Sequence, residues 1–292
     1  MKNLYHWMLA LRVKTLTAAF IPIMAATALV YHDGYKVEWL LSGFAILSAL
    51  FIQIATNLFN DAIDYKKGTD TEKRLGPKRV TQSGLISNDH VMLGGYFSLG
   101  LAVIFGLPLV YFGGWFIAIL GLVSLLLAYM YTGGPFPLAY KGLGDLFVIL
   151  FFGLAAVGGC YYIQTKVFTL GATILGLQIG FLAAALIVIN NMRDRDQDLK
   201  TNKKTLAVRF GVFFSRIEFF LLNTSPFVLQ LYWYWNGAEQ VLIYSLVSLP
   251  LALYLVYKIF TIDPGVQYNS LLAKSALVHV LFGVSTTIGF FV

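Results

Sequence analysis

Residues 39–70 read WLLSGFAILSALFIQIATNLFNDAIDYKKGTD, and this stretch decides the class of fold. No charged residue occurs from Trp39 to Asn60. A run of this length exceeds the about 20 apolar residues with which a helix crosses the hydrocarbon core of a bilayer. We therefore predict a membrane-spanning helix over residues 39–63 that runs into a polar, acidic segment.

Apolar runs of the same kind recur along the whole chain. Of its 292 residues, 58% are hydrophobic and 12% are charged, whereas a soluble domain carries roughly 25% charged residues. The composition excludes an ordinary water-soluble domain. It predicts an all-α integral membrane protein in the lipid bilayer, with residues 1–292 as one polytopic domain around a central cavity. Nine helices are predicted, over 15–31, 39–63, 91–111, 115–133, 143–163, 169–191, 212–234, 240–259 and 271–291.

The basic residues are divided unevenly between the two sides of these helices. With the N-terminus placed inside, every one of the 21 Lys and Arg residues except Lys36 and Lys166 lies on the inner side. Cytoplasmic segments of membrane proteins carry such an excess. We predict a cytoplasmic N-terminus in a bacterial inner membrane. The net charge of +7 then reflects membrane orientation, and no nucleic-acid partner is expected.

The acidic end of the run 39–63 places polar side chains on one helical face. Asn57, Asp61 and Asp64 are spaced i, i+4 and i+7, and Asn60 precedes Asp64 by four residues. Side chains at these spacings share one side of an α-helix. Because such groups are costly towards lipid, this face is expected to line the interior of the bundle.

A second acidic cluster follows the predicted helix 169–191. Asn191, Asp194 and Asp198 are spaced i, i+3 and i+7, which again defines one face. Both clusters lie at the inner end of a helix, and this similarity suggests two halves around one cavity.

Paired acidic clusters of this kind are typical of a metal–diphosphate site. Mg²⁺ prefers oxygen ligands and is usually held by one or two carboxylates together with substrate phosphates. Lys and Arg side chains balance the remaining phosphate charge, and Lys203 and Lys204 follow the second cluster. The alternative is that the Asp residues only cap helices and pair with nearby cations.

The order and spacing of the two motifs resemble the membrane prenyltransferases of the UbiA superfamily. The N-D-x-x-D signature of that family is matched by residues 60–64, and its D-x-x-x-D signature by residues 194–198. The resemblance covers nearly the whole chain and implies a Mg²⁺ cofactor and a polyprenyl diphosphate substrate. The family has a further Asp where this chain has Gly68. Either Asp70, two residues later, supplies the missing ligand from a loop, or the metal is held with fewer protein oxygens.

The motifs and the resemblance together give the expected site residues. Lys141 could instead be a topology anchor, and Arg79 and Gln82 lie in the long segment 64–90, which is expected to form a lid or a wall of the site. The expected catalytic residues are Asp64, Asp194, Asp198 and Lys141; the metal ligands are Asn60, Asp64, Asp70, Asp194 and Asp198; the substrate contacts are Asn57, Asn60, Asp61, Arg79, Gln82, Tyr131, Tyr140, Asn191, Lys203 and Lys204.

Further segments are similar to the 1,4-dihydroxy-2-naphthoate polyprenyltransferases of menaquinone synthesis. They include residues 76–84 (GPKRVTQSG) and 134–145 (GPFPLAYKGLGD). This resemblance implies polyprenyl transfer to 1,4-dihydroxy-2-naphthoate at the cytoplasmic face, with loss of diphosphate and CO₂ to give demethylmenaquinol. The alternatives are another acceptor, such as 4-hydroxybenzoate, haem or a glycerol phosphate, and a cation-coupled secondary transporter. Against a transporter, the carboxylates lie at helix ends and not near the middle of the membrane.

Overall fold

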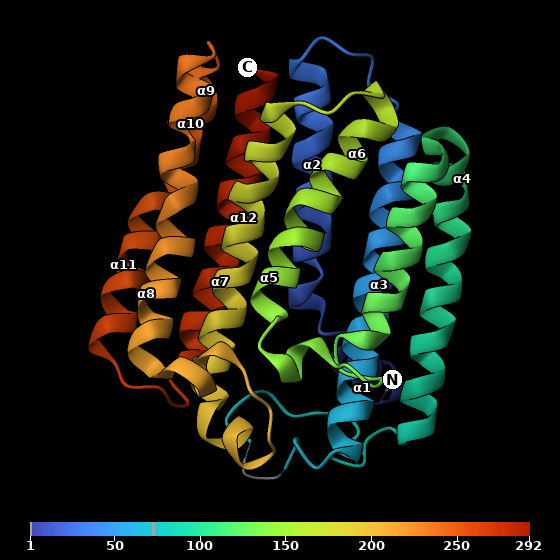
Figure 1. The fold of residues 1–292 in the computed structure, drawn as a ribbon, viewed down its shortest axis with the longest axis vertical. Helices are drawn as coiled ribbons and strands as arrows, with labels where there is room; N and C mark the ends of the chain where they lie inside the picture. Colours follow the sequence, from blue (N-terminus) through green and yellow to red (C-terminus); the bar gives the residue numbers. More distant parts are fainter. Residues whose placement is uncertain (1, 72–73) are drawn as a thin grey trace.

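The computed structural model describes residues 2–71 and 74–292, and these residues form helices and loops without a β-strand. The helices stand side by side along the long axis of the molecule (Figure 1). Their bounds are α1 Lys2–Leu11, α2 Thr17–His32, α3 Trp39–Lys66, α4 Asn88–Met130, α5 Gly144–Val148, α6 Ala156–Thr165, α7 Leu170–Lys200, α8 Leu206–Leu229, α9 Leu231–Trp235, α10 Glu239–Ser245, α11 Leu249–Thr261 and α12 Tyr268–Phe291. A π-helical segment, η3 (Ile149–Ala155), joins α5 to α6, and short 3₁₀ turns occur at Val13–Thr15 (η1), Leu138–Lys141 (η2) and Leu246–Ser248 (η4).

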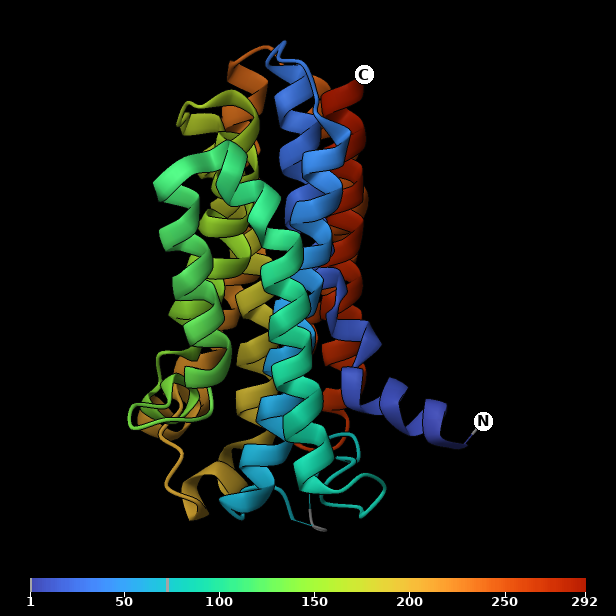
Figure 2. The ribbon, with the colours of Figure 1, turned by 90° about the vertical axis from the view of Figure 1, so that its right-hand side faces the viewer.

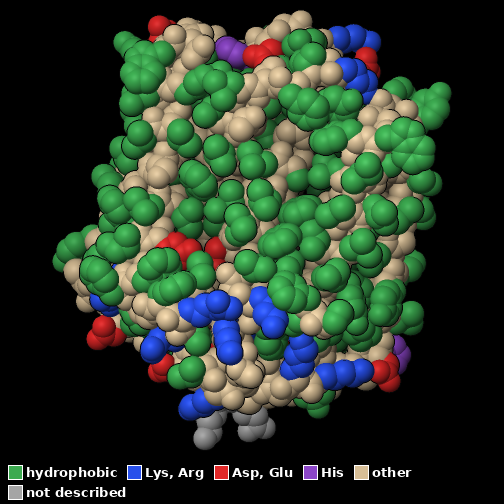
Figure 3. All heavy atoms as spheres, viewed as in Figure 1, with side chains coloured by type: hydrophobic (Ala, Val, Ile, Leu, Met, Phe, Trp, Pro, Cys, Tyr) green, Lys and Arg blue, Asp and Glu red, His purple; other side chains and the backbone are tan. Residues whose placement is uncertain are grey.

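Helix α7 is the centre of the bundle. It packs against α2, α5, η3, α6, α8 and α12. In its most apolar stretch 67% of the residues are buried, compared with 17% in that of α4, which lies at the edge of the bundle. The apolar side chains of the outer helices are therefore left facing outwards, as Figure 3 shows for one side of the molecule. A protein with this outer surface is an integral membrane protein, because water would not solvate it.

Within the described residues, a helical segment lies at each of the nine predicted ranges. Six helices are long and apolar enough to cross a membrane, and Thr17–His32 is apolar but shorter. Gly114 ends one helical stretch and starts the next inside α4, with φ 67° and ψ −159°, so the predicted break between 111 and 115 is confirmed. The number of membrane crossings and the side of the N-terminus stay predictions.

Helix α3 continues to Lys66, close to the approximate limit of 63, whereas α7 continues to Lys200 and the limit of 191 was too short. Both acidic clusters therefore lie within helices, as their helical spacing predicted. Asp61, Asp64, Asp194 and Asp198 are all buried. The many charged residues in these segments suggested that the helices end there. In the structure, other segments still pack around these turns and supply partners for the charges.

Helix α1 was not anticipated, because residues 1–14 read only as a basic segment before the first span. It projects from the side of the bundle near the N-terminus (Figure 2). Trp7, Ala10 and Leu11 pack with Leu58 and Ala62 of α3. This contact brings Arg12, in the left-handed backbone conformation at φ 51°, towards the acidic end of α3.

Glycines allow η3 to approach α7 closely. A Cβ atom at Gly153 would lie 2.3 Å from the carbonyl oxygen of Gly176 and 2.8 Å from Cα of Gly180. Small residues permit this type of helix contact in membrane proteins, where packing replaces the hydrophobic effect as the driving force. The contact fixes the wall formed by α5, η3 and α6 against the central helix.

Gly153→Ala is expected to destabilise the fold, because the added methyl group would overlap the α7 backbone, and overpacking costs about 1–3 kcal/mol. Thermal unfolding of the purified protein in detergent measures the effect. Gly158→Ala in α6 is the matched control, since a Cβ there meets nothing within 4 Å. Equal unfolding temperatures for the two variants would show that η3 can move away from α7 without loss.

Candidate active site

The two acidic clusters meet at one end of the bundle. The last turns of α3 and α7 both lie at the lower end in Figure 1, where Lys and Arg side chains gather on the surface in Figure 3. Lys203 lies close enough to be attracted electrostatically by Asp198, Asp64 and Asp194 together. The fold therefore brings residues more than 130 positions apart into one charged site.

Tyr140 joins the two clusters. Its hydroxyl donates a hydrogen bond to Oδ1 of Asp64 at 2.7 Å and lies 2.7 Å from the Thr69 hydroxyl. Nζ of Lys67 lies 4.1 Å from the centre of its ring, and Nζ of Lys203 lies 6.0 Å from it. Burial, reinforced by the charge of Asp64, raises the pKa of Tyr140. Tyr140 thus stays protonated at neutral pH and acts as a donor to the carboxylate.

Asn60 is the hydrogen-bonding hub of the first cluster. Its amide nitrogen donates to Oδ2 of Asp64 at 2.8 Å and to Thr132 at 3.1 Å. Its amide oxygen accepts hydrogen bonds from Arg12 and Arg79, each at 2.8 Å. Arg79 was expected at the site. Arg12 was missed, because in the sequence it looks like one more topology-setting charge.

Asp70 is enclosed by guanidinium groups. It forms ion pairs with Arg74 and, at 3.1 Å, with Nε of Arg79. Burial raises the pKa of Asp70 to about 6, an effect that the charge of Arg74 partly offsets. In this conformation the carboxylate neutralises cations of the loop after α3, and its role as a metal ligand stays a prediction.

The second cluster contains one satisfied and one incompletely satisfied carboxylate. Asp194 accepts two hydrogen bonds from Arg193, at 2.8 and 2.7 Å. Asp198 accepts one from Lys203 at 3.3 Å, while its buried Oδ2 has no hydrogen-bond partner among the described residues. Burial acts to lower the pKa of Lys203, but the charges of Asp198 and Asp64 outweigh it and raise the pKa overall. Lys203 is thus a cation beside a carboxylate oxygen that can accept a further ligand.

Asp61 and Asn57 face other parts of the structure in this conformation. The Asp61 carboxylate accepts hydrogen bonds from the backbone N–H groups of Val80 at 3.2 Å and Thr81 at 3.0 Å, which ties the loop between α3 and α4 to the bundle. Asn57 donates to the carbonyl of Leu11. Their expected substrate contacts stay predictions.

For three further expected residues, the side chains contact other groups or are exposed in this conformation, and their predicted roles stay predictions. Lys141 is exposed, with Nζ 5.3 Å from the centre of the Phe136 ring. Lys204 is exposed, although its backbone N–H bonds to the carbonyl of Tyr140. Gln82 is half-buried and bonds to its neighbour Ser83. Asn191 is buried on α7, and Tyr131 lines the adjoining apolar pocket.

The described residues contain no group of three or more His, Cys, Asp or Glu side chains already arranged around a metal position. Most acidic oxygens are paired with cations or with Asn60 and Tyr140. The free Oδ2 of Asp198 and the neighbouring Asp64 fit a hard cation that enters with substrate phosphates, which is the way Mg²⁺ is commonly bound.

An apolar pocket lies between α2, α3, α4 and the α5–η3–α6 wall. Tyr131 and Phe147 are among its lining residues, and so are Gln53 and Thr56, which precede the acidic cluster on α3. Along α3, the pocket therefore lies one to two turns from Asn60 of the charged site.

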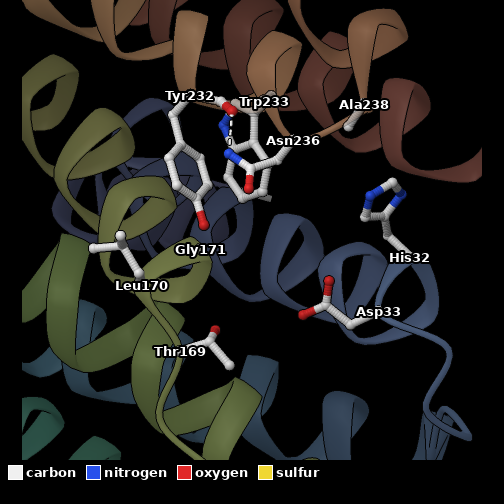
Figure 4. A pocket seen from close by; sticks show the side chains of 9 residues that line it. All are labelled: His32, Asp33, Thr169, Leu170, Gly171, Tyr232, Trp233, Asn236 and Ala238. Atoms are coloured by element: carbon white, nitrogen blue, oxygen red, sulfur yellow. Dashed lines mark hydrogen bonds between the residues drawn. The ribbon is translucent and has the colours of Figure 1, made fainter.

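A different hollow of about 270 Å³ lies at the far end of the bundle (Figure 4). Its carboxylate, Asp33, accepts a hydrogen bond from Tyr161 at 2.5 Å. His32, Thr169, Tyr232 and Asn236 also line it. This hollow lacks a cluster of charges, so we place the candidate active site at the Asp64–Asp198 end.

A family model, described as the UbiA prenyltransferase family, matches residues 19–276. The chain belongs to this family. It is therefore a prenyltransferase, and the two acidic clusters are its candidate catalytic motifs. The membrane fold and the position of both motifs agree with the resemblance seen in the sequence.

Individual relatives refine this comparison. The chain is 36% identical over 228 residues to a 1,4-dihydroxy-2-naphthoate octaprenyltransferase of Haemophilus influenzae, covering 74% of this chain and 72% of that protein. Two solved structures share the fold. A UbiA homologue from Aeropyrum pernix K1, in its apo form, has a TM-score of 0.71, 12% identity and coverage of 96% and 98%. A UbiA homologue from Archaeoglobus fulgidus, bound to DMAPP and Mg²⁺, has a TM-score of 0.62, 18% identity and coverage of 98% and 99%.

Tyr140→Phe is expected to lower prenyl transfer about tenfold or more, because a hydrogen bond to a charged group contributes about 1.5–3 kcal/mol. Steady-state turnover with a polyprenyl diphosphate measures the loss. Tyr65→Phe is the control, since Tyr65 is exposed on the same end of α3. Full activity of Tyr140→Phe would show that the bridge between the clusters does not matter for the reaction.

Proposed function

We propose that this prenyltransferase moves a polyprenyl group from polyprenyl diphosphate to 1,4-dihydroxy-2-naphthoate, with release of diphosphate and CO₂ to give demethylmenaquinol. The observation that carries the proposal is the meeting of Asp64 and Asp198 around Tyr140 and Lys203, with an apolar pocket along the preceding turns of α3. The acceptor is supported by the relative from Haemophilus influenzae, which is a 1,4-dihydroxy-2-naphthoate octaprenyltransferase.

The charges of the site suit a diphosphate. Arg12 and Arg79 converge on the oxygen of Asn60, and Lys67 and Lys203 lie on the ring of Tyr140. Guanidinium and ammonium groups bind phosphate oxygens through charge-assisted hydrogen bonds. These four cations would shift from their present partners to the leaving group as its negative charge grows.

We propose Mg²⁺ as the cofactor, held by Asp64, Asp194 and Asp198 with Asn60 and Asp70 in support. When bound, it would supply positive charge that stabilises the departing diphosphate. The related structure from Archaeoglobus fulgidus contained Mg²⁺ with DMAPP. The buried and unpaired Oδ2 of Asp198 is the feature of this chain that supports the assignment.

The reaction balances without a protein base. The bond between the allylic carbon and oxygen breaks, and its electron pair leaves with the diphosphate, which the cationic side chains bind. A π-electron pair of the acceptor ring forms the new C–C bond at the carbon that bears the carboxylate. The bond to the carboxylate carbon then breaks, CO₂ departs, and its electrons restore the aromatic ring. The apolar pocket protects the allylic cation from water.

We also propose that residues 1–292 act as one domain in a bacterial inner membrane, with the site at the cytoplasmic face. The gathering of Lys and Arg at the Asp64–Asp198 end supports this orientation (Figure 3), because cytoplasmic ends of membrane proteins carry excess positive charge.

Asp198→Asn should reduce product formation by about 10²–10³, the cost of removing one group that stabilises transition-state charge. The assay follows prenylated product and CO₂ from 1,4-dihydroxy-2-naphthoate, a polyprenyl diphosphate and Mg²⁺. Asp196→Asn is the matched control, because Asp196 is on the same helix with an 87% exposed side chain and should be fully active.

Removal of Mg²⁺ with EDTA should abolish turnover, and added Mg²⁺ should restore it. Transfer to 4-hydroxybenzoate alone would retain the diphosphate site and overturn the acceptor assignment. Full activity of Asp198→Asn, or activity after complete removal of divalent ions, would refute the proposed use of the acidic clusters.

A further inference from the structure

The apolar pocket beside the acidic clusters has an unusual polar edge. Among its lining residues are Gln53 and Thr56 of α3 and Ser124 of α4. The tail of a polyprenyl chain has no hydrogen-bonding group, so it gives no reason for polar side chains there. Their hydrogen bonds show which kind of ligand they can accept.

A chain of side-chain amides fixes the orientation of Gln53. The backbone carbonyl of Leu11 can only accept, so Asn57 must present its Nδ2 to it, at 3.0 Å. The Asn57 Oδ1 then faces Gln53 and accepts from its Nε2 at 3.3 Å. Consequently Oε1 is the free end of the Gln53 amide. This oxygen is buried without a partner among the described residues, and the whole residue is only 8% exposed.

The two hydroxyl groups at the pocket are also acceptors. Thr56 donates its proton to the carbonyl of Ile52 at 2.9 Å, and Ser124 donates to that of Leu120 at 2.8 Å. A hydroxyl has one proton and two lone pairs, so both oxygens can still accept. Gln53, Thr56 and Ser124 therefore all offer lone pairs to a ligand, and the hydroxyl protons of Thr56 and Ser124 are already used.

A ligand that satisfies this edge must bring hydrogen-bond donors on an apolar body. A prenyl chain has no donor, and a carboxylate would be repelled by the three oxygens. A ring hydroxyl meets the requirement. We propose that this pocket binds the hydroxyl-bearing ring of the aromatic acceptor, with Oε1 of Gln53 accepting a hydrogen bond from a ring hydroxyl. The inference rests on the proposed function and adds the residues that select the acceptor.

The position of the pocket also orients the ring. Along α3, Gln53 and Thr56 lie one to two turns before Asn60, whose oxygen is contacted by Arg12 and Arg79. A ring with a hydroxyl towards Gln53 would turn its carboxylate away from the lone pairs and towards these cations. The carbon to be alkylated would then face the diphosphate end of the site.

The first test needs no substitution. The wild-type enzyme is assayed with 1,4-dihydroxy-2-naphthoate and with its two monomethyl ethers, which have lost one donor each. Leaving a buried oxygen unpaired should reduce kcat/KM for one of the ethers about tenfold or more. Equal kcat/KM for all three acceptors would overturn the proposal.

Gln53→Leu should raise KM for the acceptor about tenfold, the effect of about 1.4 kcal/mol, and should remove the discrimination against that ether. KM for the polyprenyl diphosphate should not change. Ser124→Ala and Ser98→Ala form a matched pair, because both serines are on α4 and donate to the carbonyl four residues earlier, but only Ser124 lines the pocket. Only Ser124→Ala should weaken acceptor use.

A change in donor KM or in preferred chain length, with unchanged acceptor discrimination, would show that the pocket holds the prenyl tail and would overturn the inference. Equilibrium binding of 1-naphthol and 1-methoxynaphthalene, measured without donor, separates this inference from the proposed function. If no aromatic acceptor is prenylated but Gln53 is needed for preferential 1-naphthol binding, the pocket assignment stands and the proposed function fails. If 1-naphthol binds no better than 1-methoxynaphthalene, the pocket assignment fails.

Discussion

The burial of carboxylates in a protein that lies in lipid is the constraint on which the rest of the structure depends. An unpaired charge in an apolar interior is strongly unfavourable. Asp64, Asp70, Asp194 and Asp198 are each buried, and each has a cationic or hydrogen-bonding partner. The bond from Tyr140 to Asp64 holds the turn at Tyr140 against α3, and the backbone bonds to Asp61 hold the loop after α3.

The same contacts explain why the site can respond to a substrate. Asp70, Asp194 and Asp198 are paired with Arg and Lys side chains, and Asp64 accepts hydrogen bonds from Asn60 and Tyr140. A diphosphate would offer those cations a stronger partner and would release carboxylate oxygens for a metal ion. In the proposed function, the same charges would therefore serve both the stability of the protein and the binding of the substrate.

The central helix links this polar end to the apolar pocket. Helix α7 carries the second acidic cluster and also receives η3 through Gly153, Gly176 and Gly180. Because η3 and α7 are in close contact, no free space separates them. The wall with Phe147 and Phe151 is therefore held in position beside Gln53 and Tyr131. Such a wall would serve the proposed function, in which the pocket excludes water from an allylic cation.

The sequence by itself determined the membrane class, the places of the helical segments and the two acidic motifs. The length of an apolar run and the spacing of Asp residues are local properties of the sequence, so they can be read without knowing the fold. It also supplied the family through its motifs. It placed the end of α7 too early, because a charged turn looks like a helix end unless its partners are known.

Only the tertiary structure decided which basic residues lie at the acidic clusters. Arg12 donates to Asn60 and Lys203 pairs with Asp198, whereas Lys141 and Lys204 remain exposed, yet all four are simply basic residues on the inner side of the sequence. The sequence likewise does not reveal that Gln53, Thr56 and Ser124 present free acceptor oxygens to the pocket. This depends on which hydrogen-bond partner each amide and hydroxyl group finds in the folded protein. Such choices are set by distances between distant segments, and no local pattern contains them.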